Sequence, residues 1–236
     1  RRHRRPTGSR ATPRTIWLCS CHATGPSSAD VAAEEATGAS EAATVPAEHT
    51  EEAAEPSAEP AFEAAGYVHR HNHGMKSYNG VAIVSRLPFA ETDIKHFCGK
   101  EDRRHCMVTF ENGVELHNFY IPAGGDEPDP AINEKFAHKL SFIDEMTNWW
   151  SERRAANPDR KAVLVGDFNI APSENDVWSH KQLLKVVSHT PVEVEILEKF
   201  RQSGDFIDAV RDVVPEPEKL FSWWSYRARD WRKSNK

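Results

Sequence analysis

Apolar and polar positions follow regular patterns from about residue 62 onward, and these patterns predict a folded domain. Residues 79–85, NGVAIVS, form a short apolar run introduced by Asn-Gly and predict a strand. The runs HCMVTF and VELHNFYI flank Glu111-Asn112-Gly113, and Asn-Gly between two alternating runs is a strong signal for a β-hairpin. The second strand of this hairpin is therefore predicted to end near Tyr120.

Two helices and a buried strand are predicted after the hairpin. Asp129-Pro130 is typical of a helix start, where a capping residue precedes a proline in the first turn. The turn NPDR ends this helix, and the run KAVLVG that follows has the continuous apolar character of a strand buried on both faces. Thr190-Pro191-Val192-Glu193 has the form of a capping box for a second helix that ends at Gly204. The first helix has a predicted buried face made of Ile132, Phe136, Leu140, Ile143 and Met146. Alternation of helices and strands predicts an α/β fold.

Residues 1–61 differ in composition from the rest of the chain. They begin with the basic run RRHRRPTGSRATPR and continue with Ala, Glu, Pro, Ser and Thr, with few large apolar residues. Such a segment buries too little surface to offset its ordering entropy, so we expect it to be low-complexity and largely disordered. A transit peptide and an aberrant, frameshifted sequence are the alternatives. The chain also begins without a methionine, which favours a piece of a longer protein.

Composition excludes several broad classes. The formal net charge of -6 gives no global attraction to nucleic acid, so any such binding requires a local basic patch. The 4 cysteines lack C-x-x-C spacing, which argues against a zinc or redox motif and favours a reducing, cytoplasmic compartment. No apolar run approaches the roughly 20 residues that a membrane-spanning helix needs. We therefore expect no membrane partner.

The stretch AVLVGDFNIAPSEND, residues 162–176, places an acid and an amide at the end of the predicted buried strand. Residues two apart on a strand share a face, so Asp167 and Asn169 should point the same way while Phe168 points into the core. A carboxylate and an amide at the rim of a sheet suit Mg²⁺, whose usual partner is a phosphate. The carboxylate can also accept a proton from water, and the amide can stabilise a developing negative oxygen. The alternative is that the pair only caps a turn before Pro172.

Further candidates are basic and aromatic residues. Lys76 lies before the strand at residues 79–85, and Arg103 and Arg104 lie before the hairpin. Arg227 follows a tryptophan pair near the end of the chain, where basic and aromatic residues together suggest a surface that tracks phosphates. Such charged residues are also common on solvated faces. His69, His71 and His73 alternate as on one strand face, but no Cys or carboxylate nearby completes a metal site.

Four motifs together carry a family resemblance: KSYNGVAI, HNFYIPAG, LVGDFNIAP and FSWWSYR. The region from about residue 62 to 233 resembles the exonuclease III family of Mg²⁺-dependent nucleases, which act at abasic sites in DNA. GD-x-N by itself also resembles the wider endonuclease/exonuclease/phosphatase superfamily. The resemblance implies a four-layered α/β sandwich with two packed mixed sheets, for which residues 62–236 would supply a partial nuclease domain.

The resemblance also implies roles for individual residues. Asp167 matches the carboxylate that transfers protons near the metal, and Asn169 matches the amide that stabilises the transition state and also belongs to the metal site. Tyr120 matches a tyrosine that bonds the scissile phosphate, although it would otherwise be an ordinary rim aromatic. Trp223 matches the aromatic that lines the pocket for the baseless sugar. The implied cofactor is Mg²⁺, or Mn²⁺ in its place, and the implied partner of this expected monomer is duplex DNA with abasic sites or 3′ ends.

Two elements of the family pattern are not found in this sequence. The family opens with a strand bearing an Asn and a Gln-Glu motif whose Glu binds the metal, and it closes with an Asp-His pair. We therefore expect a fold that is incomplete at both ends and a chain that is weak or inactive as an enzyme. The alternatives are a catalytically deficient fragment that binds DNA, and a superfamily phosphodiesterase that acts on RNA or another phosphodiester.

Overall fold

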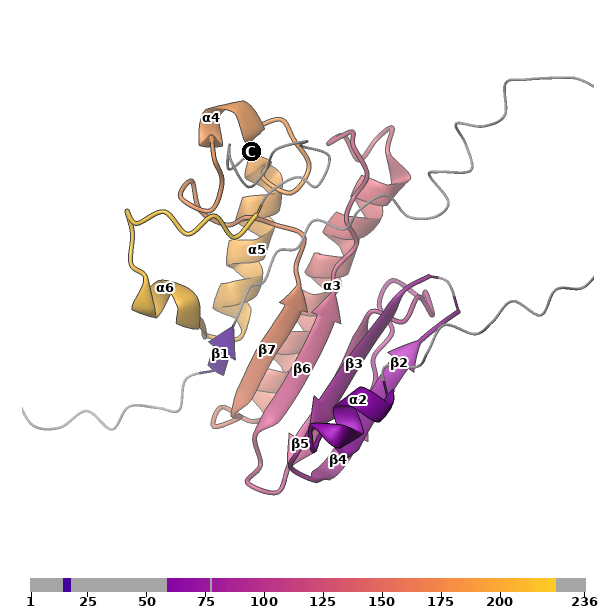
Figure 1. Cartoon of the computed structure of the whole chain (residues 1–236). Coiled ribbons are helices and arrows are strands. Elements are labelled where there is room, and N and C mark those ends of the chain that lie inside the picture. The colour runs from indigo at the N-terminus through magenta and orange to yellow at the C-terminus, as the bar shows by residue number, and fades with distance from the viewer. Residues whose placement is uncertain (1–14, 18–58, 77, 224–236) are drawn as a thin grey trace, which may run out of the picture.

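The structure, a computed structural model, describes residues 15–17, 59–76 and 78–223 of the chain (Figure 1). Within this part, eight strands form two sheets. The larger sheet contains, in spatial order, β4 (Phe89–Asp93), β5 (His105–Phe110), β6 (Glu115–Tyr120), β7 (Ala162–Asp167), β1 (Thr15–Trp17) and β8 (Phe206–Asp208). The smaller sheet is the antiparallel pair β2 (His69–Gly74) and β3 (Gly80–Ser85).

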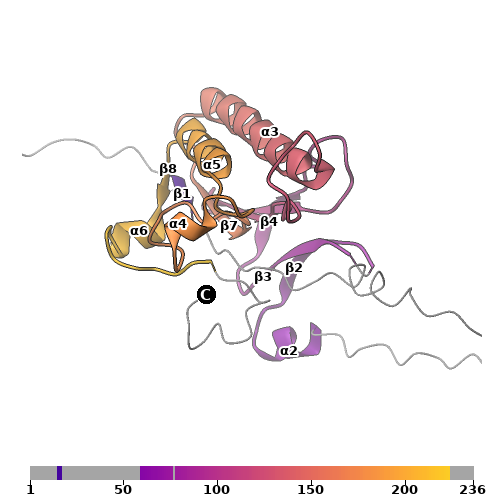
Figure 2. The same cartoon turned by 90° about the horizontal axis from the view of Figure 1, so that it is seen from above.

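The elements stack in layers, as Figure 2 shows. The long helix α3 (Glu134–Ala156) and helix α5 (Pro191–Ser203) cover one face of the larger sheet, and the β2–β3 hairpin lies against the other face. Beyond the hairpin lies the short helix α2 (Glu59–Ala64), while α4 (His180–Leu183) and α6 (Ala209–Val213) lie beside α5 and β8. The predicted α/β fold with two packed sheets is confirmed. The larger sheet is mixed, whereas the smaller sheet is antiparallel over the residues described.

The predicted hairpin forms between β5 and β6. Its turn lies at Glu111-Asn112-Gly113, where Gly113 takes the positive φ of 76° that this turn requires. Ladder pairs such as His105 with Phe119 fix the register, and the pairing continues beyond β5 because the Tyr120 amide donates to the Arg104 carbonyl at 2.8 Å. The hairpin therefore places Arg104 opposite Tyr120 at its open end.

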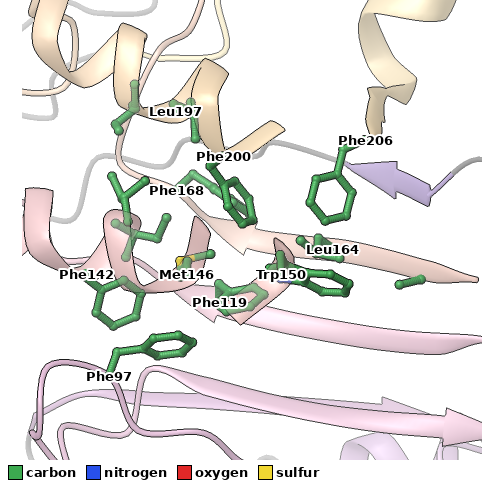
Figure 3. Close-up of a cluster of buried hydrophobic side chains, with 14 residues drawn as sticks. Phe97, Phe119, Phe142, Met146, Trp150, Leu164, Phe168, Leu197, Phe200 and Phe206 are labelled. Carbon is green, nitrogen blue, oxygen red and sulfur yellow. The ribbon is translucent and has the colours of Figure 1, made fainter. Parts of the chain in front are cut away.

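Strand β7 lies between β6 and β1 and is parallel to both. Ala162 and Leu164 of this strand pack between the sheet and the helices, together with Phe168 just after the strand (Figure 3). Val163 and Val165 alternate with them and are only partly buried, so the prediction of equal burial on both faces was wrong. Other members of this core come from α3, α5, β6, β8, the loop before β5 and the loops after β6 and β7. They include Phe97, Phe119, Ile121, Phe142, Met146, Trp150, Ile170, Leu197, Phe200 and Phe206. Dense aromatic packing on both helices makes the position of β7 rigid.

The start of α3 differs from the sequence prediction. The helix begins at Glu134 with Asn133 as its cap, and the Asn133 side chain accepts bonds from the amides of residues 135 and 136. Asp129-Pro130 instead forms a separate turn, in which the Asp129 carbonyl accepts from the amides of Ile132 and Asn133. Ile132 consequently lies outside the helix and is 74% exposed, so its assignment to the buried face was wrong.

Other local predictions agree with the structure. Helix α5 has the capping box, with Thr190 as its cap and Glu193 at the third position, and it ends at Gly204. Helix α3 ends at Ala156, next to the predicted NPDR turn. Residues 15–17 form β1 between β7 and β8, although they lie in the segment for which the sequence predicts disorder. The rest of residues 1–58 lies outside the described residues.

Candidate active site

Tyr120 and Asp167 lie at the carboxyl ends of adjacent parallel strands. They are register partners across β6 and β7, and the amide of Ile121 donates to the Asp167 carbonyl at 2.9 Å just beyond the strand ends. In α/β sheets this edge is where ligands bind, because the loops that follow the strands surround it. The structure thus brings together two residues that are 47 positions apart in sequence.

Gly166 allows β7 to approach β6 closely next to Asp167. Its φ is 122°, and a Cβ added there would lie 2.0 Å from the carbonyl oxygen of Phe119. A side chain at this position would therefore overlap the backbone of β6 and would require a rarely adopted backbone conformation. Glycine at this position sets the placement of Asp167 relative to Tyr120.

Asn169 lies beyond the end of β7 and does not share a strand face with Asp167, so that prediction was wrong. It has a positive φ of 51°, and its amide N–H donates to Asp167 Oδ1 at 2.9 Å. Its side chain is almost fully buried, and Nδ2 donates to the carbonyl of Ile121 at 2.9 Å. Phe168 points into the core as predicted. The backbone amide of Asn169 therefore bonds the Asp167 carboxylate within this turn, while the Asn169 side chain holds the loop that follows Tyr120.

The side-chain oxygen atoms of Asp167 and Asn169 suit a hard cation such as Mg²⁺. Since Nδ2 of Asn169 donates to Ile121, Oδ1 is the atom of this amide that can coordinate metal. The turn bond uses one of about four lone-pair positions of the Asp167 carboxylate. Over the described residues, no group of three or more His, Cys, Asp or Glu side chains is arranged to hold a metal ion. Mg²⁺ bound here would keep several water ligands, as it commonly does.

Arg104, which the sequence offered either as a basic DNA contact or as a solvated charge, is buried and contacts the tyrosine. The Arg104 guanidinium lies 4.9 Å from the centre of the Tyr120 ring, and its NH1 donates to the Tyr120 carbonyl at 3.2 Å. Arg104 is itself held by Asp102 Oδ2 at 2.5 Å. The register of the predicted hairpin was a usable signal, because it places residue 104 opposite residue 120.

A buried lysine was missed entirely. Lys139 on α3 is fully buried and lies within 2.5 Å of Glu193 Oε1, and its Nζ donates to the Asn169 carbonyl at 2.6 Å. The signal was present in the sequence, because Lys139 lies three residues after Phe136 and four before Ile143, on the predicted buried face. A lysine at such a position requires a partner, since an unpaired buried charge is costly.

Two of the residues predicted to bind DNA, Lys76 and Trp223, differ in their exposure. Lys76 is exposed in the turn between β2 and β3. This turn lies at the same end of the molecule as the carboxyl ends of β6 and β7 (Figure 1). This turn is linked to the site because Asn79 Nδ2 donates to the carbonyl of Asp102 at 2.9 Å. Trp223 is 9% exposed and packs with Ala171, Val177 and Leu183, next to the loop that follows Asn169. Arg227 lies outside the described residues.

The three alternating histidines of β2 have separate partners. His73 Nδ1 bonds the carbonyl of His105 at 2.8 Å, and His71 Nε2 bonds the carbonyl of Asp93 at 3.1 Å. His69 packs against the ring of Phe89. They therefore serve the contact between the two sheets, in agreement with their interpretation as ordinary strand residues.

None of the helices in the described ranges is both long and apolar enough to cross a membrane.

Sequence comparison identifies relatives for most of the chain. An exodeoxyribonuclease of Bacillus subtilis (strain 168) is 24% identical over 153 residues, which cover 65% of this chain and 58% of the relative. Exodeoxyribonuclease III of Haemophilus influenzae is 27% identical over 179 residues, which cover 71% of this chain and 64% of the relative. These names agree with the resemblance that the four motifs predicted.

Structure comparison agrees with the sequence relatives. An AP endonuclease from Archaeoglobus fulgidus superimposes with a TM-score of 0.64 at 26% identity, covering 75% of this chain and 66% of that protein. The chain thus spans less than two thirds of the length of each of these three proteins. A family model described as the Endonuclease/Exonuclease/phosphatase family matches residues 31–235, which include the strand ends and loops of the candidate site. The chain therefore belongs to the endonuclease/exonuclease/phosphatase family.

Proposed function

We propose that this chain carries the catalytic rim of a metal-dependent DNA-repair nuclease of the exonuclease III type. The rim consists of the carboxyl ends of β6 and β7, at Tyr120 and Asp167, with the loops that follow them. The proposed substrates are phosphodiesters at abasic sites and at 3′ ends of duplex DNA, as the names of the relatives suggest. The observation that supports the proposal most directly is the pairing of Tyr120 with Asp167 at adjacent strand ends, with Asn169 bonded to that carboxylate. A monomer in a reducing, cytoplasmic compartment belongs to the same proposal.

Each residue has a distinct chemical task in this reaction. The Asp167 carboxylate accepts the proton of the attacking water, and the Tyr120 hydroxyl donates a hydrogen bond to a phosphate oxygen as negative charge develops there. The Asn169 side chain would contribute Oδ1 to the metal, because its Nδ2 donates to the carbonyl of Ile121. Mg²⁺ or Mn²⁺, when bound by Asp167 and Asn169, supplies positive charge that stabilises the phosphate in the transition state.

DNA contacts would surround this rim. We expect Lys76 to contact DNA from the β2–β3 turn. Trp223 packs against the loop after β7, and Arg227 belongs to the basic segment that follows Trp223 in the sequence. Because the formal net charge is -6, binding would depend on these local cations and would weaken steeply as salt rises.

A synthetic duplex with one abasic site tests the proposal. We expect wild-type protein to cut it with Mg²⁺ or Mn²⁺ but not with EDTA, and Asp167→Asn to lose at least about a hundred-fold in rate because the proton acceptor is gone. Lys199→Met is the matched control, since Lys199 lies exposed on α5 and pairs with Asp144. Equal cutting by wild type and Asp167→Asn would remove the proposal. Competition by RNA duplexes would reveal a preference for another phosphodiester.

A second candidate is a fragment that binds DNA without cutting it. It is favoured because the described residues supply two metal-ligand candidates, Asp167 and Asn169, whereas the family pattern includes a further Glu and an Asp-His pair. The chain also spans less than two thirds of the length of the two exodeoxyribonuclease relatives. This candidate predicts salt-sensitive binding that persists in Asp167→Ala, weakens in Arg227→Ala, and produces no turnover.

A further inference from the structure

Lys139 connects the two loops that carry the candidate catalytic residues. Its Nζ donates to the carbonyl of Ala123, in the loop after β6, at 3.1 Å. It also donates to the carbonyl of Asn169, in the loop after β7, at 2.6 Å. Its ion-pair partner, Glu193, lies in the first turn of α5. An ammonium group has three N–H donors, and these three acceptors come from three different segments.

Glu193 is held as firmly as its partner. It is fully buried, and its carboxylate accepts bonds from the amide of Ser188 at 2.9 Å and from the amide and hydroxyl of Thr190 at 3.1 and 2.7 Å. The same carboxylate therefore closes the capping box of α5 and neutralises Lys139. Since both helices pack on the sheet, the ammonium group has a fixed position relative to β6 and β7.

Stability alone does not account for such a pair. Removing two charges from water costs several kcal/mol per ion, and a buried ion pair is often no more stabilising than apolar residues of similar volume. The contacts of Lys139 point to a different use, because two of its acceptors are loop carbonyls next to the candidate site. One of them belongs to Asn169, which has a positive φ of 51° in the left-handed region, a conformation that asparagine adopts more readily than most residues but that still needs support from its surroundings. A bond to its carbonyl helps to hold that conformation.

We propose that Lys139 and Glu193 are positioning residues for Asn169 and for the loop after Tyr120. The pair fixes the Asn169 carbonyl. The Asn169 side chain in turn bonds the Ile121 carbonyl, and the backbone amide of Asn169 bonds the Asp167 carboxylate. Through this chain of bonds, a charge in the core sets the geometry of the acid and the amide at the rim. The catalytic part of this inference rests on the proposed nuclease function, whereas its structural part does not.

The test uses the double variant Lys139→Met with Glu193→Gln, which removes both charges and leaves neither one unpaired. The Glu193→Gln change keeps an acceptor for the capping box, because an amide oxygen still accepts from backbone N–H groups. With the abasic duplex, we expect kcat to fall roughly ten- to a hundred-fold because of misplaced groups, while the Kd for DNA measured in EDTA changes less than about two-fold. Lys139→Met alone should be less stable than the double variant, since it leaves Glu193 charged and unpaired.

Two controls separate positioning from general destabilisation. Asp144→Asn with Lys199→Met removes an exposed ion pair between the same two helices, at 3.2 Å, and should leave kcat unchanged. Leu197→Val shortens a core side chain of α5 and leaves the Lys139–Glu193 pair with its bonds to the loops in place, and it serves to match any loss of melting temperature. Loss of kcat in the double variant that is no larger than in a Leu197→Val protein of equal melting temperature would overturn the inference.

An independent readout does not require activity. In NMR spectra, the side-chain amide of Asn169 and the backbone amides of Asn169 and Ile121 should shift, and their hydrogen exchange should accelerate, in the double variant but in neither control. Unchanged resonances and exchange would refute the positioning role. If wild-type protein fails to cut abasic DNA, the proposed function fails, and these resonances alone decide the inference.

Discussion

The two ends of strand β6 both have buried charged groups beside them, but these groups have partners of different kinds. At the carboxyl end, Lys139 bonds backbone carbonyls of the loops after β6 and β7. At the amino end, Glu115 bonds side chains: Arg153 NH2 at 2.7 Å, Arg160, and His117 Nε2 at 3.1 Å. The first arrangement fixes loop geometry, whereas the second fixes α3 and the strands to each other.

The amino-end network continues as a directed chain of hydrogen bonds. The backbone amide of Lys95 donates to His105 Nδ1 at 3.1 Å, so the proton of neutral His105 lies on Nε2. That group donates to His117 Nδ1 at 3.0 Å, and His117 Nε2 in turn donates to Glu115. Burial lowers the pKa of both histidines, and contact with His117 lowers the pKa of His105 further. We therefore predict that the network of Glu115, His117 and His105 controls stability and its pH dependence, while the loops after β6 and β7 control catalysis.

The largest effect is expected for Gly166→Ala, because this substitution should change both stability and catalysis. A Cβ there would lie 2.0 Å from the Phe119 carbonyl oxygen, so β7 would have to move away from β6 and carry Asp167 with it. We expect the free energy of unfolding to fall by roughly 4 kcal/mol and nuclease activity to be lost. Gly113→Ala is the control, because Gly113 has a positive φ of 76° but no neighbouring atom within 4 Å. Equal urea midpoints for the two variants would contradict the close approach.

The next largest effect is expected for Glu115→Gln, which should lower stability and leave catalysis unchanged. Burial by itself raises the pKa of Glu115, but the bonds from His117 and Arg153 outweigh it and lower that pKa to about 2. Loss of this charge leaves Arg153 and Arg160 without their counterion, and we expect unfolding to become easier by about 3 kcal/mol. At a temperature where the variant stays folded, its kcat on an abasic duplex should equal that of wild type. A large loss of kcat in folded protein would show that the two ends are not independent.

The smallest effect is a dependence of stability on pH. Because the folded-state pKa of His105 and His117 lies below 6.5, the unfolded chain binds more protons as pH falls through that value, and stability declines. From pH 7 to 5.5 we expect a loss on the order of 2 kcal/mol in urea titrations. The lowered pKa of Glu115 adds a further loss below pH 4.5, since that carboxylate must remain charged in the folded state.

A variant assigns this dependence to the hydrogen-bond chain. His117→Gln removes one titrating group and should flatten the stability curve between pH 7 and 5.5. His105 still titrates in this variant, and three other histidines whose pKa is lowered chiefly by burial act in the same direction: His73, His138 and His189. Together they account for the remaining slope. A curve unchanged by His117→Gln would show that the protons are taken up elsewhere.

Much of the candidate site followed from local sequence signals. The Asn-Gly turn fixed the β5–β6 register, and with it the position of Arg104 opposite Tyr120. The apolar run before Asp167 predicted a buried strand that ends at this acid, and the capping box of Thr190 and Glu193 predicted the start of α5. These features depend on bonds between residues a few positions apart, so the sequence encodes them directly.

Other features were decided by contacts between distant segments. The local pattern favoured a helix start at Asp129-Pro130 with Ile132 buried, but Asn133 makes the cap bonds and Ile132 lies in the preceding turn. Strand spacing suggested that Asn169 shares a face with Asp167, but the chain leaves the sheet first and turns with positive φ. In both places two local arrangements compete, and the packing of α3 and of the loops on the sheet selects one.

The sequence by itself thus determined which residues lie at the ends of β6 and β7, because periodicity and turn chemistry act over short distances. Only the tertiary structure decided that Lys139 meets Glu193, which lies 54 residues further along the chain, and that both Asn169 and Ala123 bond the same ammonium group. A buried charge must find its partner wherever the helices pack, since the cost of leaving it unpaired is large. That requirement is a property of the assembled core, and no single segment of the sequence contains it.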